Sequence, residues 1–287
     1  IRKIRHIAEA IARALRITGP FNIQFLAQDN RVRVIECNLR ASRSFPFCSK
    51  VSRVNMIDLA VRAMLGSAAG TETGAETAEK SPVSALELDW VGVKAAQFSF
   101  SRLHGADPVS GVEMASTGEV ACIGPDLNDA FLKALLSVGY RAPLDSSGRR
   151  RALLSTGPME DKVEFLGSAR KLVDLGWELC ASRGTAKFLA AHGIPTRPLN
   201  WPLESKEPNI AGFIKRREVD MVINIPKNNR ETELKNDYLI RRLAVDFDIP
   251  LFTNVKAARQ FIDSLEAWRE KGGGLHGMEI KAWEEYR

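Results

Sequence analysis

The first 65 residues alternate between helical and extended hydrophobic patterns. In residues 2–17 apolar side chains recur at three- and four-residue spacing, which predicts an amphipathic helix that Gly19-Pro20 ends. Residues 21–26 and 32–37 have the pattern of strands, and turn chemistry at 28–30 predicts that they form a β-hairpin. The chain thus opens with a helix followed by a two-stranded element.

The next part of the chain has weaker periodicity. Residues 66–82 are small, polar and acidic with no repeating pattern, which predicts a flexible surface loop. Around this loop the pattern predicts two helices and three short strands: helices at 55–65 and 128–137, and strands at 83–88, 91–99 and 119–123. A polar break at 143–151 suggests a domain boundary, giving predicted domains 1–150 and 151–287.

From residue 152 onward, strand and helix patterns alternate regularly. Strands are predicted at 152–156, 177–181, 219–225 and 250–253, and helices at 161–175, 185–192, 209–217, 237–247 and 255–270. Such alternation indicates βαβ units and a parallel sheet. The glycines after residue 271 predict a loosely held tail.

Composition excludes several classes of protein. The chain has 287 residues, of which 45% are hydrophobic and 26% charged, so a mainly disordered chain, a collagen-like chain and a disulfide scaffold are excluded. No apolar run approaches the roughly 20 residues of a membrane span. The first residue is Ile1 inside a helical pattern, which suggests a piece of a longer polypeptide with no signal peptide.

Charge and cysteine content limit which ligands, metal sites and compartment we expect. The net charge of +6 suits anionic ligands, but the basic residues are scattered apart from 149–151, a run that we interpret as a solvated linker. Nucleic-acid binding is therefore not expected. The four cysteines and four histidines lack zinc-site spacing. Dispersed, buried thiols suggest a reducing compartment.

The predicted hairpin carries a first cluster of polar residues. Glu36, Asn38 and Arg40 are spaced by two, so they share one face of a strand, and Gln24 lies on the partner strand. One carboxylate and two amide oxygens are ligands that Mg²⁺ accepts. Arg40 and Arg43 could hold phosphate oxygens. The alternative is a half-exposed edge hairpin with an ordinary polar face.

Residues 21–50, FNIQFLAQDNRVRVIECNLRASRSFPFCSK, closely resemble the metal-binding hairpin of an ATP-grasp domain. More narrowly, they resemble the second ATP-grasp unit of the carbamoyl-phosphate synthase large chain. Residues 107–124 resemble the region that closes this unit. Leu39 stands where bacterial members more often have proline, which is similar to the animal-type variant.

This resemblance implies metal-binding roles for Gln24, Glu36 and Asn38 and phosphate handling by Arg40. It also implies an ATP-dependent ligase that uses Mg²⁺ or Mn²⁺ to make carbamoyl phosphate from bicarbonate and ammonia. The opposite wall of the family's ATP site lies N-terminal to the hairpin. We therefore expect the 287-residue chain alone to be inactive, as an incomplete ATP-grasp α+β lobe.

A second cluster follows the strand at 177–181. Ser182, Gly184 and Thr185 precede a helix whose free N–H groups and positive dipole end suit phosphate. Lys162 could approach the same sheet edge, Trp201 could cover a ligand, and Asn224 ends the strand at 219–225. The alternative is ordinary helix capping by the hydroxyls and core packing by the tryptophan.

Residues 152–270 resemble the methylglyoxal-synthase-like domain of the same large chain. The pieces that carry this resemblance are LLST, DLGWELCASRGTAKFLAAHGI, NWP, VDMVINIP and NDYLIRRLAVDFDIPLFTN. It implies a Rossmann- or flavodoxin-like regulatory domain that binds IMP, a uridine nucleotide (UMP or UTP) or N-acetylglutamate. Trp201 and the Ile-Asn-Ile-Pro run are similar to animal-type versions and disfavour IMP. Lys227 replaces an asparagine of the N-acetylglutamate type, and Ser182 replaces a threonine.

Three functions remain open. The first is the C-terminal part of a carbamoyl-phosphate synthase large chain, which the resemblance implies. The second is a free-standing module that binds a small anion, and the third is a methylglyoxal-forming lyase. The lyase needs a carboxylate base beside the phosphate-binding loop, and the end of the strand at 219–225 offers Asn224 and Pro226 but no acid, which disfavours it. The resemblance implies a glutaminase partner, separate or fused, no membrane partner, and an open question of homo-oligomerisation. It also implies a cytoplasmic parent, or a mitochondrial-matrix parent of the urea-cycle type.

Overall fold

The computed structural model describes residues 1–66, 88–109, 115–141, 148–226, 231–273, 278–282 and 285–286. It contains two compact units. One comprises Ile1–Trp90 with Lys281–Arg287, and the other comprises Val91–Ile280. Most of the predicted flexible loop at 66–82, most of the predicted strand at 83–88, and Lys227 lie outside the described residues.

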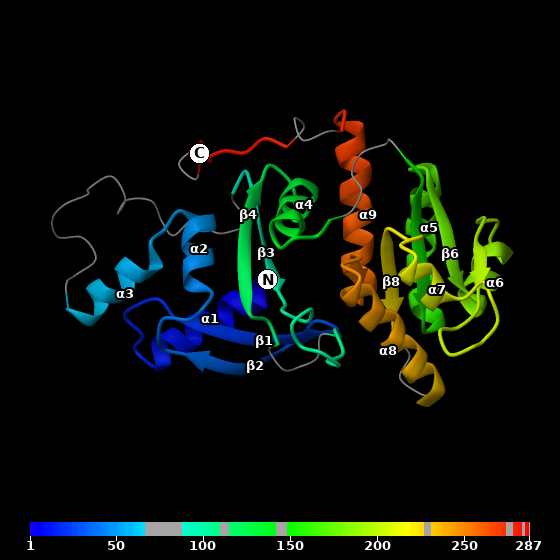
Figure 1. The fold of residues 1–287 in the computed structure, drawn as a ribbon. Helices are drawn as coiled ribbons and strands as arrows, with labels where there is room; N and C mark the ends of the chain where they lie inside the picture. Colours follow the sequence, from blue (N-terminus) through cyan, green and yellow to red (C-terminus); the bar gives the residue numbers. More distant parts are fainter. Residues whose placement is uncertain are drawn as a thin grey trace. The chain divides into compact units, whose positions relative to one another are not determined.

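The described residues of the first unit form a hairpin and three helices (Figure 1). The elements are α1 (Arg2–Ala14), β1 (Asn22–Gln28), β2 (Arg31–Asn38), α2 (Phe45–Ser52) and α3 (Met56–Met64). Asp29 and Asn30 both have positive φ, of 49° and 59°, as a two-residue hairpin turn requires. The predicted helices and hairpin are confirmed. The prediction missed α2, which is short and carries proline in its first turn.

The end of the chain returns to this first unit. The ring of Tyr286 contacts that of Trp90 edge-on, with 6.5 Å between centroids, and its carbonyl accepts a 2.7 Å hydrogen bond from Arg53 Nη1. The Trp90 indole in turn donates to the Val51 carbonyl at 2.9 Å. Part of the predicted loose tail is therefore held by specific contacts.

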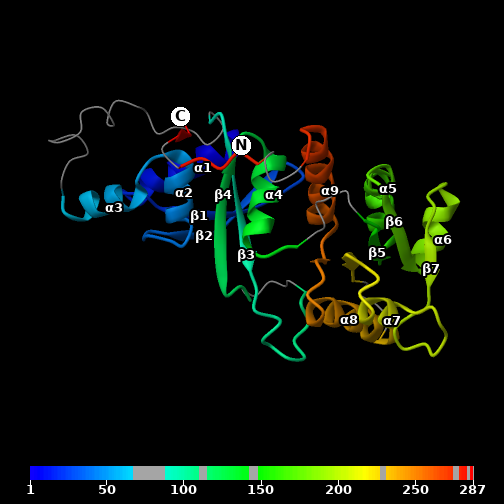
Figure 2. The same ribbon diagram turned by 45° about the horizontal axis from the view of Figure 1, so that its top comes forward.

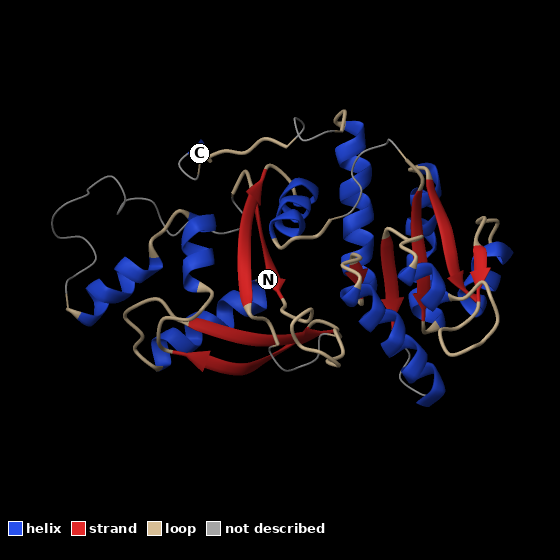
Figure 3. Cartoon of the chain, viewed as in Figure 1, coloured by secondary structure: helices blue, strands red, loops and turns tan. Residues whose placement is uncertain are grey.

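The second unit begins with an antiparallel pair and a helix, and continues with a parallel α/β layer structure (Figures 2 and 3). The first three elements are β3 (Val91–Gln97), β4 (Gly118–Gly124) and α4 (Leu127–Ser137). The rest are β5 (Arg150–Thr156), α5 (Met159–Asp174), β6 (Trp177–Ser182), α6 (Arg183–Ala191), β7 (Arg197–Leu199), α7 (Ile210–Lys215), β8 (Met221–Ile225), α8 (Glu231–Asp246), β9 (Leu251–Phe252) and α9 (Val255–Glu270).

The five parallel strands follow the order β7-β6-β5-β8-β9. The chain therefore runs outward in one direction from β5 and then returns to add β8 on the other side, which makes β5 and β8 the point where the order reverses. All four strand pairs are parallel, so the predicted parallel sheet is confirmed. The prediction missed β7, which has only three residues and contains a proline.

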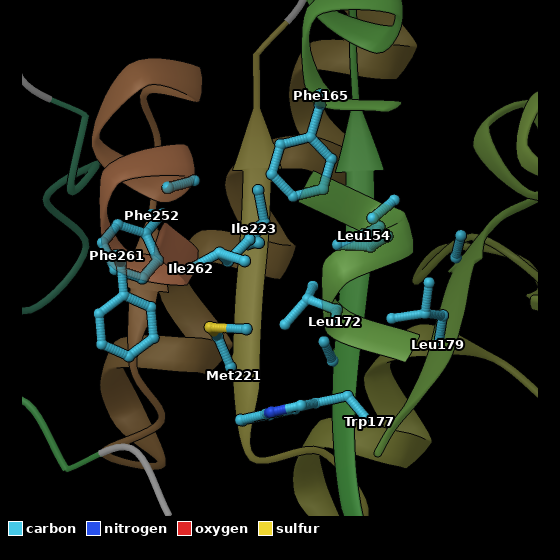
Figure 4. Packing of buried hydrophobic residues seen from close by; sticks show 14 of the residues in the cluster. Leu154, Phe165, Leu172, Trp177, Leu179, Met221, Ile223, Phe252, Phe261 and Ile262 are labelled. Atoms are coloured by element: carbon cyan, nitrogen blue, oxygen red, sulfur yellow. The ribbon is translucent and has the colours of Figure 1, made fainter. Parts of the chain in front are cut away.

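Successive residues of the central strands enter different cores. Leu154 faces the larger cluster, which contains residues of α5, α6 and α9, whereas Leu153 faces the cluster that contains residues of α7 and α8. Figure 4 shows the larger cluster, with Phe252 beside Phe261. No helix in the described part of the chain is long and apolar enough to cross a membrane.

The arginine run at 149–151 is not a solvated linker, and that interpretation is wrong. Arg150 and Arg151 belong to β5, and Arg151 is buried. Its Nη1 donates to the Glu218 carbonyl at 2.7 Å, and its backbone N–H donates to Asp220 at 2.7 Å. The sequence pattern could not show this, because an arginine that is buried with carbonyl and carboxylate partners has the same sequence signal as an arginine on the surface.

Helix α4 packs on α9, although the prediction places them in different domains. Leu132 belongs to the same buried cluster as Phe261, and Gln260 donates to Asn128 at 2.7 Å. The compact units therefore divide near residue 90, whereas the predicted domains divide at residue 150. The boundary at 150 stays a prediction about how the chain is assembled from family units.

The start of α4 is held by Asp126, whose carboxylate accepts from the Asp129 N–H at 2.8 Å and from Lys271 at 2.9 Å. The backbone bond first, and Lys271 after it, lower the pKa of Asp126 against the opposing effect of desolvation. A lowered pKa contributes stability above the ordinary value of about 3.9, and this contribution is lost as the pH falls through the folded-state value.

We predict that Asp126→Ala lowers the free energy of unfolding by about 1 kcal/mol at neutral pH, because it removes the cap. Asp126→Asn keeps a capping oxygen and should cost less. Urea unfolding at pH 7 and pH 3 measures both variants. The difference between wild type and Asp126→Asn should shrink at the lower pH, and a difference that grows there would contradict the role of the charge.

Candidate functional site

The hairpin brings the predicted metal ligands together. Gln24 lies directly opposite Glu36 in the register of β1 and β2, and Asn38 Nδ2 donates to Glu36 Oε1 at 2.9 Å. A bulge between Gln24 and Phe25 leaves Ile35 as the extra residue of β2, just before Glu36. Asn22 lies opposite Asn38 and adds a third amide to this face, which the sequence analysis missed.

These side chains offer one carboxylate beside amide groups on the same face of the hairpin. Gln24 and Glu36 are exposed and Asn38 is half-buried, so a solvated cation can reach them. The described residues contain no group of three or more His, Cys, Asp or Glu side chains that could hold a metal ion. A cation here would depend on amide oxygens beside a single carboxylate, a donor set that suits Mg²⁺ with retained waters.

Arg40 and Arg43 follow β2 and are both exposed. Arg40 Nη1 donates to the Ala41 carbonyl at 3.1 Å, which keeps its guanidinium beside the strand end. The structure therefore leaves both arginines accessible to an anionic ligand next to the Glu36 face. Their contact with phosphate oxygens stays a prediction.

The second cluster lies at the carboxyl ends of β5, β6 and β8. Ligands of open α/β sheets bind in the crevice at this edge, and we call this edge the crevice. Ser182 Oγ lies 3.4 Å from Ser155 Oγ and 3.3 Å from Thr185 Oγ1. Thr185 Oγ1 also accepts from the Thr156 N–H at 3.3 Å. We call these four residues, Ser155, Thr156, Ser182 and Thr185, the hydroxyl cluster. All four are buried, and they lie where β5 and β8 mark the reversal of strand order.

The alternative of ordinary capping does not describe this geometry. Ser182 occupies the N-cap position of α6, but its side chain makes no capping hydrogen bond. Its hydroxyl lies beside those of Ser155 and Thr185 instead. Gly184 is exposed in the first turn, and a Cβ there would meet nothing within 4 Å, so the backbone borders open space. This helix start therefore has the free N–H groups that bind anions.

Asn224 lies beside the hydroxyl cluster and is fully buried. Its Nδ2 donates to Asp237 Oδ1 at 2.8 Å, and its Oδ1 accepts from Arg241 Nη1 at 2.8 Å. Asp237 Oδ1 also accepts from Ser155 Oγ at 3.4 Å. The structure thus connects the end of β8 to the hydroxyl cluster through a carboxylate on α8.

Lys162 and Trp201, the other two predicted effector-binding residues, are both partly accessible to solvent. Lys162 lies in the first turns of α5 and is half-buried. Trp201 is also half-buried and packs against the smaller core cluster, and its backbone N–H donates to Glu204 Oε2 at 3.1 Å. Part of the Trp201 ring therefore has a core role, while its exposed part leaves the predicted ligand-covering role open.

The residues of this site that were not predicted from the sequence are Ser155, Thr156, Asp237 and Arg241. A carboxylate does lie near these strand ends, because Asp237 of α8 contacts Ser155 and Asn224. The Asp237–Arg241 spacing of four residues was visible, but such spacing usually marks an exposed helical pair. Both residues are buried here, so the pair belongs to the interior.

The thiols do not contribute to either cluster as catalytic groups. All four cysteines are free, and only Cys180 is buried, so the prediction of buried thiols is wrong for Cys37, Cys48 and Cys122, which are half-buried. Burial raises the pKa of the Cys180 thiol despite nearby arginines, which keeps it protonated. A protonated thiol inside the sheet acts as a small apolar side chain.

Two family models match the chain. The MGS-like domain matches residues 164–253, and a model described as ATP-grasp in the biosynthetic pathway with Ter operon matches residues 2–89. The second match contains the hairpin, and the first contains Ser182, Thr185, Asn224 and Asp237. Together with the parallel sheet, they confirm the predicted fold class of an incomplete ATP-grasp lobe followed by an MGS-like α/β domain.

Curated relatives match nearly the whole chain. It is 47% identical over 274 residues to the multifunctional protein pyrABCN of Emericella nidulans, covering 92% of this chain and 11% of that protein. It is 43% identical to the mitochondrial carbamoyl-phosphate synthase [ammonia] of Aquarana catesbeiana, covering 93% and 17%. The human protein of that name is 40% identical, covering 94% and 18%. The chain thus spans 11–18% of the length of these relatives.

Proposed function

Because the chain belongs to the family of carbamoyl-phosphate synthase large chains, of which it matches the C-terminal part, we propose that it serves such an enzyme in two ways. Its hairpin contributes one wall of an ATP site, and its MGS-like domain binds an allosteric effector. The complete enzyme would form carbamoyl phosphate from bicarbonate and glutamine-derived ammonia, using ATP. It would serve arginine or pyrimidine biosynthesis, or the urea cycle.

The hairpin geometry supports the first role. Gln24, Glu36 and Asn38 would hold Mg²⁺ or Mn²⁺ through a carboxylate and amide oxygens on one face. The bound ion would neutralise charge on the transferred phosphoryl group. Arg40 and Arg43, exposed just beyond β2, would hold phosphate oxygens in place. These side chains position and stabilise charge, which is most of what phosphoryl transfer requires from a protein.

The crevice supports the second role, and it is the observation that carries the proposal for the MGS-like domain. An anionic group would bind the uncapped start of α6 and the hydroxyls of Ser182 and Thr185. Lys162 would add positive charge. Asn224 would present an amide at the strand end, and Trp201 would cover the apolar or aromatic part of the effector. Trp201 favours N-acetylglutamate or a uridine nucleotide over IMP.

The complete enzyme would need a source of ammonia. A glutaminase, as a separate subunit or a fused domain, would supply ammonia. The compartment would be the cytoplasm, or the mitochondrial matrix for a urea-cycle enzyme. A free-standing module that binds a small anion without catalysis is the second candidate, and the uncapped, open start of α6 is the observation that favours it.

We predict that Thr185→Ala weakens effector binding about tenfold or more, because it removes a hydrogen bond to a charged group worth roughly 1.5–3 kcal/mol. Calorimetric titration of the 287-residue chain with UMP, UTP, IMP and N-acetylglutamate measures this effect. Thr185→Ser keeps the hydroxyl and should retain affinity. Thr196→Ala is the matched control, since that hydroxyl donates to the Ile194 carbonyl away from the crevice.

Two results would contradict the proposal. Binding of none of these ligands at millimolar concentration would refute the effector class. Binding that Thr185→Ala leaves unchanged would show that the ligand occupies another site.

A further inference from the structure

The loop between β3 and β4 is fastened to α8 by three side chains. Arg242 donates to the carbonyls of Phe100, Leu103 and Ala106, each at 3.1 Å. Tyr238 OH donates to the Gly105 carbonyl at 3.0 Å. Both side chains hold the described part of this loop, residues 98–109, by its backbone. Within the described residues, no hydrogen bond of either side chain reaches a residue of the crevice.

Arg241 holds the same loop in a different way. Its guanidinium grips the Asp107 carboxylate with two bonds, from Nε at 2.7 Å and from Nη2 at 2.5 Å. Its remaining terminal nitrogen, Nη1, donates to Asn224 Oδ1. The Arg241 side chain is 3% exposed, whereas that of Asp107 is 41% exposed. One buried cation therefore joins a loop carboxylate to the amide at the end of β8.

The contacts continue from this amide into the effector crevice. Asn224 Nδ2 donates to Asp237, and Asp237 accepts from Ser155 of the hydroxyl cluster. The sequence Asp107, Arg241, Asn224, Asp237, Ser155 is thus an unbroken series of polar contacts within the second unit. Because Arg241 can donate only through its planar fork, the position of Asp107 fixes which nitrogen reaches Asn224.

Asp237 and Arg241 also lie four residues apart on α8, on one face of the helix. Leaving a buried guanidinium without a carboxylate partner is costly, and Asp237 is the carboxylate one helical turn before Arg241 on α8. Turning toward Asp237 would take that carboxylate away from Asn224 and Ser155. The loop pairing therefore competes with a rearrangement that changes the wall of the crevice.

We propose that Arg241 is a positioning residue that couples the 98–109 loop to the effector crevice through Asn224. This inference rests on the crevice function proposed above. While Asp107 holds the guanidinium, Arg241 orients the Asn224 amide and leaves Asp237 to Asn224 and Ser155. When the loop withdraws Asp107, Arg241 pairs with Asp237 and the crevice loses its arrangement. By linkage, an effector that favours one arrangement must favour the matching position of the loop.

The test uses Asp107→Asn in the 287-residue chain, with UTP and N-acetylglutamate as separate calorimetric probes. We expect the variant to change the affinity of the bound probe at least about fivefold, the lower range of measured coupling between sites. Asp107→Glu keeps a carboxylate and should restore most of the affinity. Tyr238→Phe removes a loop bond on the same helix without touching Arg241, and its affinity should stay within twofold of wild type.

A crystal structure of ligand-free Asp107→Asn separates this inference from the proposed function. We expect Arg241 to leave Asn224 and pair with Asp237. If wild type binds neither probe, the effector proposal fails, and the crystal structure alone decides the coupling. An Arg241 that keeps its bond to Asn224 in the variant overturns the inference, as does an unchanged probe affinity or an equal effect of Tyr238→Phe.

Discussion

Glu36→Gln is expected to lower the rate of carbamoyl-phosphate synthesis roughly a hundredfold in an enzyme that carries this chain, a loss of about 2.7 kcal/mol of transition-state stabilisation. The substitution keeps the shape of the side chain and removes the single carboxylate from a face of amides. A hard cation then loses its only charged ligand in the cluster. Folding should be unaffected because Glu36 is exposed.

Steady-state rates at limiting and saturating Mg²⁺ measure this effect. Glu9→Gln is the matched control, because Glu9 is an exposed glutamate that pairs with Arg13 on α1, outside the hairpin. An unchanged rate at limiting Mg²⁺ would show that Glu36 is structural only. The isolated 287-residue chain should form no carbamoyl phosphate above background, since one wall of the site cannot position the reactants.

Phe261→Ala should lower the free energy of unfolding of the second unit by about 3–5 kcal/mol. The Phe261 ring is fully buried, with its centroid 5.1 Å from that of Phe252 and 5.2 Å from that of Tyr140 (Figure 4 shows Phe261 beside Phe252). Truncation removes the ring contacts to Tyr140, which follows α4, and to Phe252 of β9 at once. The neighbouring rings cannot collapse into the space without leaving their own contacts.

Urea unfolding followed by circular dichroism measures this loss. The control is Leu203→Ala, whose side chain is 58% exposed and whose truncation should change the free energy by under about 0.5 kcal/mol. A loss below about 1 kcal/mol for Phe261→Ala would mean that α4 and α9 do not share one core.

Much of this fold could be predicted because its elements differ in hydrophobic period. The alternation after residue 152 follows from strands that are buried on both faces, such as β5 and β8, separated by amphipathic helices. The features that were not predicted are a strand that is very short and a buried charge that has no distinct sequence signal. Three residues of β7 carry too little pattern to identify, and the buried Arg151 resembles an ordinary surface charge.

The two clusters were predictable to different depths. Register alone places Gln24 opposite Glu36, so a hairpin prediction already implies their proximity. The crevice hydroxyls follow from strand ends in a parallel sheet. Arg241, however, meets Asp107 across 134 positions of sequence, and no local pattern reveals such a pair. Sequence spacing finds groups that one element or one sheet edge brings together, and it does not find those that a docked loop supplies.

The packing of α4 on α9 has a consequence for how the protein is made. A ribosome synthesises α4 more than a hundred residues before α9, yet the apolar face of α4 is buried against residues of α9. Until α9 has left the exit tunnel, Leu132 and its neighbours have no complete partner surface. Contacts of such long sequence separation form slowly, and exposed apolar faces attract chaperones and other nascent chains. The second unit therefore closes only after nearly all of this chain has been translated.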